Sequence, residues 1–369
     1  MTIDLESISS PARVASPEEG ISADELRLAA RNHGMPLESL HWDITPAGLH
    51  YLLIHYDIPA IDPTTFELVI DGVVGSPLSL DLDAIRSRPK VTAVVTLECA
   101  GNGRARLLPR PVSQPWLTEA VGTARWSGTP LLGLLQEAGI AEEAVDVVFT
   151  GADHGIERGL EQDYQRALPV TEALREDVLL AYEMNGAPLP PQHGAPLRLV
   201  VPGWYGMAHV KWLRRITLVA QPFDGFQMRA YRLRDTPDEP GVPVTRIEPR
   251  ALLVPPGFPD FMSRRRVVRS GPVRIEGRAW SGWAPVSKVE VSIDGGDTWE
   301  PADLERAQAS HGWARWTWTW QSELGSYVLA CRATDASGRT QPLGQRWSRG
   351  GFANNTIQRV PVIVISSEM

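Results

Sequence analysis

The stretch VVTLECAGNGR, residues 94–104, joins an apolar run typical of a β-strand to a tail of small residues. It carries Cys99, one of only two cysteines in the chain, at the junction. A cysteine at the end of a strand is held on a rigid element, while small residues leave its surroundings open. Arg104 and the backbone amides of Gly101 and Gly103 would lower the pKa of the thiol. From these residues alone, a buried structural cysteine is the alternative.

The common catalytic motifs are missing from the sequence. No second cysteine lies near Cys99, which excludes a zinc ribbon and a thioredoxin-like dithiol. The histidines form no H-x-x-x-H pair and there is no Walker loop, so neither a zincin nor a P-loop protein is predicted. GNGR lacks the third glycine of a dinucleotide fold, and GWYGMAHVKW contains no nucleophile elbow. A cysteine hydrolase with a distant histidine stays open at this point.

Length, composition and charge bound the remaining choices. The 369 residues suffice for two domains, and 43% apolar with 22% charged residues is typical of soluble globular proteins. The net charge of −8 argues against nucleic-acid binding. No apolar run reaches the roughly 20 residues of a membrane span, and the N-terminus has no secretory signal pattern. We therefore expect a cytoplasmic protein without membrane contact, with Cys99 and Cys331 as free thiols.

The first half of the chain has a mixed pattern. Residues 52–220 alternate short β-branched runs with turn signals and helical patterns, which indicates a mixed α/β domain. Thr129 and Pro130 predict the start of one helix, with Thr129 as its cap. The pattern of residues 170–186 predicts one or two further helices that end at Asn185-Gly186.

The second half reads as all-β. A proline-rich stretch predicts a linker, or an arm that lies over the first domain. Beyond it, runs of period two and a hairpin signal at residues 294–297 predict an immunoglobulin-like β-sandwich. Trp316, Trp318 and Trp320 would share one strand face, either in the core or in a subunit interface. The predicted segments are a tail at 1–24, the mixed domain at 25–235, the linker at 236–262 and the sandwich at 263–369.

Several motifs together resemble one family. TLECAGNGR resembles the cysteine motif of the sulfite oxidase family of molybdopterin enzymes, and other similar segments occur in the order of that family. They are ARNHGMP (30–36), PWLTEAVGTARWSG (115–128), LLAYEMNGAPLPPQHGAPLRLVVPGWYG (179–206), HVKWLRRI (209–216) and QMRAY (227–231). VEVSIDGGDTWEPADL and RWSRGGFANNTIQRV are similar to the dimerisation domain of the family. The resemblance covers residues 25–365, nearly the whole chain.

The resemblance implies an α+β protein, with a mixed α/β molybdopterin-binding domain followed by an immunoglobulin-like β-sandwich dimerisation domain. One molybdenum per chain would be held by one pterin dithiolene and by the thiolate of Cys99, a soft ligand that suits a sulfur-bound metal. Cationic and hydrogen-bonding side chains would bind a pterin with a phosphate tail. The implied cofactor contacts are Arg31, Asn32, His33, Asp153, His193, Arg198, His209, Val210 and Lys211.

The resemblance also implies a pocket for a small oxoanion such as sulfite. Its residues would be Arg31, Arg104, Trp116, Tyr231 and Arg349, whose guanidinium groups replace the hydration that the anion loses. The implied reaction is oxygen-atom transfer that converts sulfite to sulfate, with Cys99, Tyr231, Arg31 and Arg104 as catalytic residues. Arg349, from the second domain, would close the pocket.

The resemblance carries expectations about partners and leaves two other functions open. We expect no haem, because the sequence before Arg31 has no room for the haem domain of the animal enzymes. Electrons would then pass to a cytochrome c-like carrier or to oxygen, and the chain would form a homodimer through its second domain. The open alternatives are a nitrate or other oxoanion or oxide reductase with the same cofactor, and a binding module without catalysis. Arg349 favours sulfite, since the nitrate branch of the family varies there.

Overall fold

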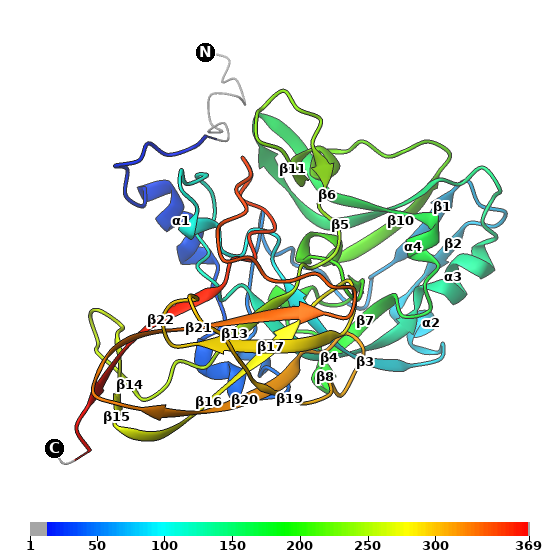
Figure 1. Cartoon of the computed structure of the whole chain (residues 1–369). Coiled ribbons are helices and arrows are strands. Elements are labelled where there is room, and N and C mark those ends of the chain that lie inside the picture. The colour runs from blue at the N-terminus through cyan, green and yellow to red at the C-terminus, as the bar shows by residue number, and fades with distance from the viewer. Residues whose placement is uncertain (1–12, 368–369) are drawn as a thin grey trace.

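The computed structural model describes residues 13–367, and Figure 1 shows that the chain folds into two parts. One mixed sheet, one antiparallel sheet and the α-helices form the first part, which is drawn in blue to green (Figure 1). Two further sheets, drawn in yellow to red, form the second part. Among the described residues, no helix is long and apolar enough to cross a membrane.

The first sheet of the mixed part has five strands in the order β2, β1, β10, β5, β6. Their bounds are Leu78–Leu80, Leu68–Gly72, Leu213–Val219, Asp146–Glu157 and Leu160–Pro169. β1 and β10 are parallel and the other pairs are antiparallel. Alternate side chains such as Leu68, Ile70 and Phe149 enter one buried core with α2 (Leu82–Arg86) and α3 (Leu131–Ala138).

The second sheet of the mixed part positions the cysteine. Its strands are β3 (Val91–Glu98), β4 (Val121–Pro130), β7 (Leu179–Met184) and β8 (Ala187–Pro188), and β9 (Arg198–Val200) also pairs with β7. β3 is exposed where it begins, and its last four residues are buried. It ends at Glu98, so Cys99 follows directly from a fixed, buried strand end, as the sequence predicted.

One helix prediction was right except for its cap, and the other was mostly wrong. β4 extends to Pro130, and α3 begins at Leu131 without a side-chain cap, so Thr129 lies in a strand. Residues 170–186 contain only the short α4 (Val170–Ala173) before β7. β7 is buried almost throughout because β4, β8 and β9 pair with it, and such apolar runs have no period-two alternation.

Part of the predicted tail is attached to the mixed part. Residues 1–12 lie outside the described residues, whereas Val14 forms a β-bridge with Pro111 and Arg110 binds Glu25. Helix α1 (Ala23–Arg31) begins with a capping box between Ser22 and Glu25. Helix α5 spans Phe226–Ala230, and short 3-10 turns lie at Leu37–His41, Ala47–Leu49, Arg104–Arg106, Pro191–His193 and Gly206–Ala208.

The second part is a sandwich of two sheets. One sheet has the order β13 (Arg250–Leu253), β16 (Gly271–Trp280), β20 (Ala314–Ser322), β19 (Asp303–Leu304). The other has the order β14 (Phe258–Pro259), β15 (Arg266–Arg269), β22 (Gln358–Ile365), β21 (Gly325–Asp335), β17 (Val286–Ser292), β18 (Glu300–Pro301). Both sheets contribute to one apolar core, which confirms a β-rich second part. Its immunoglobulin-like character stays a prediction.

Two details of the sandwich follow the sequence. The three tryptophans of β20 face its core: Trp316 and Trp320 are buried and Trp318 packs against them, which confirms the core interpretation. The loop at residues 294–297 joins the antiparallel strands β17 and β18, with Gly295 and Gly296 at positive φ. This confirms the predicted hairpin. Both cysteines are free, as predicted.

The proline-rich segment is more structured than a linker. β12 (Val242–Pro243) pairs with β11 (Arg232–Leu233), and β13 is a fully buried strand of the sandwich. Val244 and Ile247 enter an apolar cluster between the two parts of the molecule, together with Trp280. The segment is therefore packed against both parts. Its assignment as a linker at 236–262 stays a prediction only for the residues outside its strands.

Candidate active site

Cys99 lies at the wall of a cavity in the mixed part. Its backbone N–H donates to the carbonyl of Ala120 at 2.9 Å, and the residue is 6% exposed. Burial raises the pKa of the Cys99 thiol, while the charge of Arg104, the Gly101 amide and the Trp116 indole oppose this shift. The geometry thus combines a buried thiol with groups that stabilise its thiolate.

The small residues after Cys99 admit a side chain and a second segment. Gly101 packs against the guanidinium of Arg104, so that a Cβ there would clash with this group. Gly103 has φ +90°, and a Cβ on it would lie 2.8 Å from the Asn354 carbonyl oxygen. The sequence analysis predicted that the small residues leave this space open. The structure gives it to Arg104 and to residues from the end of the chain.

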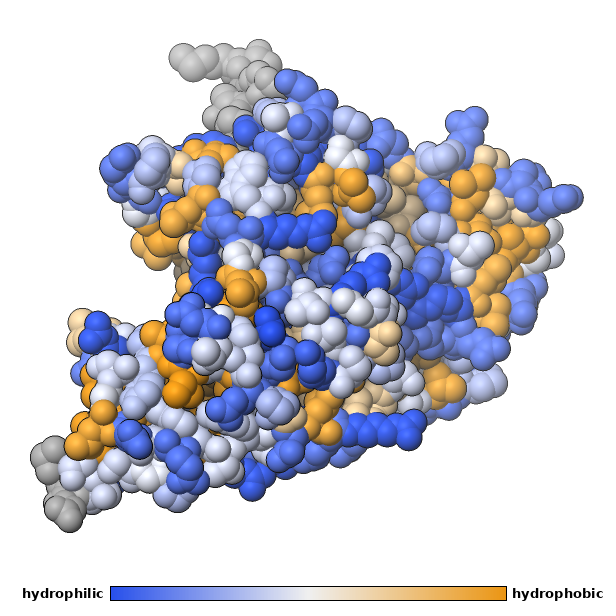
Figure 2. All heavy atoms as spheres, viewed as in Figure 1, coloured by the Kyte–Doolittle hydropathy of each residue, from blue (hydrophilic) through white to orange (hydrophobic). Residues whose placement is uncertain are grey.

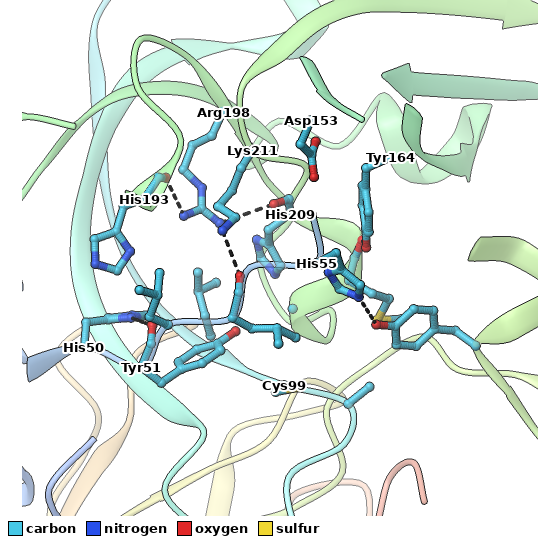
Figure 3. A pocket seen from close by; sticks show the side chains of 17 residues that line it. His50, Tyr51, His55, Cys99, Asp153, Tyr164, His193, Arg198, His209 and Lys211 are labelled. Atoms are coloured by element: carbon cyan, nitrogen blue, oxygen red, sulfur yellow. Dashed lines mark hydrogen bonds between the residues drawn. The ribbon is translucent and has the colours of Figure 1, made fainter. Parts of the chain in front are cut away.

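A group of buried cations lies across the cavity from Cys99 (Figure 3). Arg198 donates to the carbonyls of His193 at 2.9 Å and His209 at 3.3 Å, and burial lowers its pKa to about 10. Lys211 donates to the carbonyls of Leu53 at 2.8 Å and Gln192 at 3.3 Å. Burial, and then the charge of Arg198, lowers the pKa of Lys211 to about 7. Neither cation has a carboxylate ion-pair partner among the described residues.

Three histidines of the same cavity are uncharged at neutral pH. Burial lowers the pKa of His50 to about 4, that of His193 to about 2 and that of His209 to about 3. His50 and His193 meet edge to face, with ring centroids 5.5 Å apart. Neutral imidazoles each offer one donor and one acceptor, which suits a planar ligand with mixed hydrogen-bonding edges.

Unsatisfied polar atoms in this cavity test whether the residues fit a pterin cofactor. Asp153 Oδ1, His50 Nε2 and Arg198 Nε are buried and have no hydrogen-bond partner within the described part of the chain. Burial also raises the pKa of Asp153 to about 6. Buried polar atoms normally have partners, so these three indicate a ligand with donors, acceptors and negative charge. The residues therefore fit a molybdopterin with a phosphate tail.

Metal binding would depend on Cys99 alone among the protein groups. Residues 13–367 contain no cluster of three or more histidine, cysteine or acidic side chains that could hold a metal ion. A metal at Cys99 would therefore take its other ligands from the cofactor, and a dithiolene supplies the soft donors that match a thiolate.

A tyrosine and a histidine meet beside Cys99. The ring Nε2 of His55 lies 3.0 Å from the hydroxyl of Tyr231, the bond dashed at His55 in Figure 3. The His55 ring packs against Tyr164, with centroids 5.0 Å apart, and Tyr164 donates to the carbonyl of Met207 at 2.9 Å. The predicted Tyr231 thus lies in the cavity, but with a partner that the sequence analysis missed.

A second, outer cavity of about 390 Å³ adjoins the first. The two share Leu53, His55, Cys99 and Tyr231 as lining residues. The outer cavity also receives Arg104 and Arg349, as predicted for the substrate pocket. Trp116, which was also predicted for this pocket, is buried beside Cys99 and does not line either cavity.

The two arginines of the outer cavity differ in their bonding. Arg104 Nε donates to the Gly350 carbonyl and Nη1 to the Gln114 carbonyl, both at 3.0 Å. The guanidinium of Arg349 has no hydrogen bond or ion pair among residues 13–367. Arg349 comes from the end of the chain, which also contacts the cysteine loop through the bond from Ala353 N–H to the Ala100 carbonyl. Both parts of the molecule therefore build this cavity.

The Arg-Asn-His segment lies elsewhere than predicted. Arg31 is exposed, donates to the Tyr56 carbonyl at 2.7 Å and pairs with Asp57, and His33 is also exposed. Neither lines a cavity, and Asn32 lines only the outer one. The segment instead pairs with residues 52–54, through bonds between His33 and Leu52 and from Ile54 N–H to Asn32 Oδ1 at 2.7 Å.

Residues 50–55 occupy the cavity wall instead. His50, Tyr51, Leu53 and His55 line the inner cavity, and none of them was predicted. The signal in the sequence was two of the eight histidines within one short aromatic stretch, HYLLIHY. Val210, predicted as a cofactor contact, packs its side chain in the apolar core, while its carbonyl accepts from Leu199 N–H at 2.8 Å. Asp153, His193, Arg198, His209 and Lys211 do meet in one cavity.

Comparisons with known proteins agree with this arrangement. Residues 55–227 match the oxidoreductase molybdopterin binding domain, and residues 257–365 match the Mo-co oxidoreductase dimerisation domain. Mitochondrial sulfite oxidase of Rattus norvegicus is 35% identical over 87% of this chain, which spans 62% of that relative. Sulfite oxidase of Gallus gallus is 37% identical, over 81% of this chain and 68% of the relative.

Two other similar proteins have names that indicate different substrates. Nitrate reductase [NAD(P)H] of Hordeum vulgare is 31% identical over 90% of this chain and 41% of its own. The crystal structure of the sulfane dehydrogenase SoxCD from Paracoccus pantotrophus matches with a TM-score of 0.79 and 25% identity, over 97% of this chain and 89% of that chain. With both domain patterns and a full-length fold in agreement, the chain belongs to the sulfite oxidase family of molybdopterin-dependent oxidoreductases.

Proposed function

We propose that this protein oxidises sulfite to sulfate at a molybdenum bound to Cys99, and passes the electrons to an external acceptor. Sulfite and water give sulfate, two protons and two electrons. The observation that carries the proposal is that Cys99, Tyr231, Arg104 and Arg349 border one cavity. The sulfite oxidases of rat and chicken support the choice of substrate.

The side chains of the outer cavity bind and orient the anion. The guanidinium of Arg349, which has no hydrogen bond or ion pair among the described residues, and that of Arg104 hold the oxygens of sulfite by charge-assisted hydrogen bonds. Trp116 is buried beside Cys99 and keeps water from the thiolate. The hydroxyl of Tyr231 points toward the same space and exchanges a proton with His55. The cofactor, when bound, supplies the two-electron redox chemistry and the transferred oxygen.

The inner cavity holds the cofactor. Arg198 and Lys211 bind its phosphate. Burial disfavours the positive charge of both side chains, and a bound anion compensates this cost. Asp153 accepts a hydrogen bond from a pterin N–H through its unsatisfied Oδ1. His50, His193 and His209 offer neutral ring nitrogens to the pterin edges. Cys99 is the one protein ligand of the metal.

A second candidate is the reduction of nitrate or of another oxoanion or oxide. The similar nitrate reductase from barley supports it, because the same cofactor and a cationic pocket serve oxygen transfer in either direction. The unpaired Arg349 favours an anion in both cases. Parallel assays of sulfite oxidation and nitrate reduction on one preparation distinguish the two.

The remaining expectations complete the proposal. The acceptor is a cytochrome c-like carrier or oxygen, the chain carries no haem of its own, and the protein is cytoplasmic. It forms a homodimer through the sandwich, which the match to a dimerisation domain supports. The proposed domain bounds are 25–235 and 263–369.

The test is a metal and activity measurement on protein matured in a host that makes the cofactor. We expect one molybdenum per chain by elemental analysis, and sulfite-dependent reduction of an artificial acceptor. Fully metallated protein that leaves sulfite untouched rejects the substrate. Protein that stays free of metal and pterin in such a host supports a binding module without catalysis.

A further inference from the structure

One cation expected at the substrate is missing from the pocket. Arg31 points outward to Asp57, with its side chain 49% exposed. Leu53, an apolar residue, lines both cavities beside Cys99. Of the three predicted guanidinium groups, those of Arg104 and Arg349 line the outer cavity, and each can hold one oxygen of an anion. Arg13, which pairs with Glu19, and Arg158, which lies over the Phe226 ring, line it as well.

His55 does not replace the missing charge. It lines both cavities and is partly buried, and this burial, followed by the charges of Lys211 and Arg104, lowers its pKa to about 4. Its ring is therefore neutral at pH 7 and bonded to Tyr231. The carboxyl groups of Asp24, Glu25 and Glu157 also line the outer cavity, three against its four arginines, and add negative charge when ionised. This set of groups favours one negative charge over two.

The outer cavity is larger than a small oxoanion requires. A cavity of about 390 Å³ lies in the range of sites for organic ligands. Part of its wall is apolar, formed by the buried Ile54 and Phe352, the half-buried Leu53 and the exposed Leu28 and Ile156. Figure 2 shows apolar residues in patches among hydrophilic ones over the visible face.

We infer that the preferred substrate is an organic sulfinate, R–SO2⁻, whose two oxygens bind Arg104 and Arg349 and whose group R lies in the apolar outer cavity. This inference rests on the proposed function, because it uses the same sulfur oxidation. The sulfur lone pair accepts one oxygen, which forms an S–O bond and leaves the S–C bond intact. The sulfinate and water give the sulfonate R–SO3⁻, two protons and two electrons, which pass to the same external acceptor.

The inference differs from sulfite oxidation in what the pocket recognises. Sulfite has three oxygens and up to two negative charges, whereas a sulfinate has two oxygens, one charge and an apolar substituent. Leu53, which lines both cavities beside Cys99, has no hydrogen-bond donor in its side chain. Burial of the substituent adds affinity in proportion to its apolar area, so a benzene ring gains more than a methyl group.

The experiment measures kcat/KM of the holoenzyme for benzenesulfinate, methanesulfinate and sulfite. We expect benzenesulfinate to have a KM about tenfold lower than methanesulfinate, because the ring buries more apolar area. Ile156→Trp narrows the outer cavity and lowers the ratio of benzenesulfinate to sulfite kcat/KM by about tenfold. Leu160→Trp, on the exposed neighbouring strand, lines neither cavity and leaves the ratio unchanged. Leu53→Arg restores a third cation and shifts the ratio toward sulfite.

A binding measurement separates this inference from the proposed function. Calorimetry with benzenesulfonate, the product, should give saturable binding that Ile156→Trp weakens about tenfold. If sulfite is oxidised and benzenesulfinate is not, the inference is overturned and the proposed function stands. If metallated enzyme oxidises neither substrate, the proposed function is wrong. If that enzyme also fails to bind benzenesulfonate, the inference is overturned too. If it binds benzenesulfonate and Ile156→Trp weakens this binding, the result still supports a site for an organic anion.

Discussion

At the scale of single residues, the site combines groups that burial holds in their uncharged or unpaired forms. Burial raises the pKa of Cys99 and lowers the pKa values of Lys211 and the cavity histidines. The guanidinium of Arg349 has no hydrogen bond or ion pair in the described chain. Such groups cost stability unless a ligand compensates them. The cost is therefore explained by an anionic cofactor and an anionic substrate that these residues bind.

Arg349 should act on the substrate and not on the cofactor. We expect Arg349→Ala to raise the KM for sulfite about tenfold, because it removes one charge-assisted hydrogen bond. Molybdenum content should stay at the wild-type level, since Arg349 does not line the inner cavity. Steady-state kinetics with metal analysis on the same sample measures both. Equal loss of metal and of affinity would mean that the residue is structural.

Lys211 should give the cofactor-free protein a distinctive pH dependence. Its folded pKa of about 7 lies below the ordinary value of 10.5, so between these values the unfolded chain binds the extra proton. Stability therefore rises with pH from 7 upward. We expect wild type to gain about 2 kcal/mol relative to Lys211→Met between pH 7 and 9. Urea unfolding at several pH values tests this, and parallel pH profiles for the two proteins would contradict it.

Sequence reasoning found the residues whose motifs are local. Cys99 and Arg104 share one short stretch, and Lys211 lies in a motif that β9 and β10 fix in the cavity. It missed His55, because the contact with Tyr231 joins residues 176 positions apart. It also placed Arg31 at the substrate, whereas pairing of that segment with residues 52–54 turns the guanidinium to the surface.

At the scale of elements, the end of β3 is joined to the sandwich next to Cys99. Glu98 forms a buried ion pair with Arg250 of β13 at 2.7 Å, and accepts from Trp280 Nε1 of β16 at 2.7 Å. Asn102 donates at 3.0 Å to Glu98 Oε1, the oxygen that Arg250 also contacts, whereas Trp280 donates to Oε2. Three segments far apart in sequence are therefore fixed to one carboxylate, and this determines where the thiol lies.

Removal of Arg250 should destabilise the whole molecule. We expect Arg250→Met to cost about 3–5 kcal/mol, because it leaves the carboxylate of Glu98 buried without its cation. Arg214→Met, which breaks an exposed pair with Asp163, should cost less than about 1 kcal/mol. Chemical denaturation of cofactor-free protein measures both. A double variant, Glu98→Gln with Arg250→Met, should recover part of the loss, and similar costs for the two arginines would contradict the account.

The element predictions failed where tertiary pairing decides the structure. The apolar run in residues 179–184 has the composition of a helix or a buried strand, and its three strand partners make it β7. The proline-rich segment contains β13 because β16 pairs with it, which no local signal reveals. The period-two runs of the sandwich were predicted correctly, because each strand there has one core face.

At the scale of the whole molecule, the sandwich has two roles in this account: it supplies Arg349 to the cavity, and it carries the proposed dimer contact. The hairpin of β14 and β15 exposes large apolar side chains, with Phe261 82% and Met262 84% exposed. Both lie within the matched dimerisation domain.

The dimer should depend on this hairpin. Sedimentation equilibrium should give twice the 40.6 kDa mass of the chain. We expect the variant with Phe261→Ser and Met262→Ser to weaken dimerisation at least tenfold, since two exposed apolar side chains lose their burial. Leu160→Ser, which removes an exposed apolar group from the mixed part, is the control. A wild-type protein that stays monomeric at micromolar concentration would contradict the proposal.

X-ray absorption at the molybdenum edge tests the central claim most directly, because it counts the sulfur atoms bonded to the metal. The account predicts three in the wild-type protein, two from one pterin dithiolene and one from Cys99, and two in Cys99→Ser protein that still holds its pterin. Two sulfur ligands in the wild type, or a count that Cys99→Ser leaves unchanged, would show that this thiol does not bind the metal.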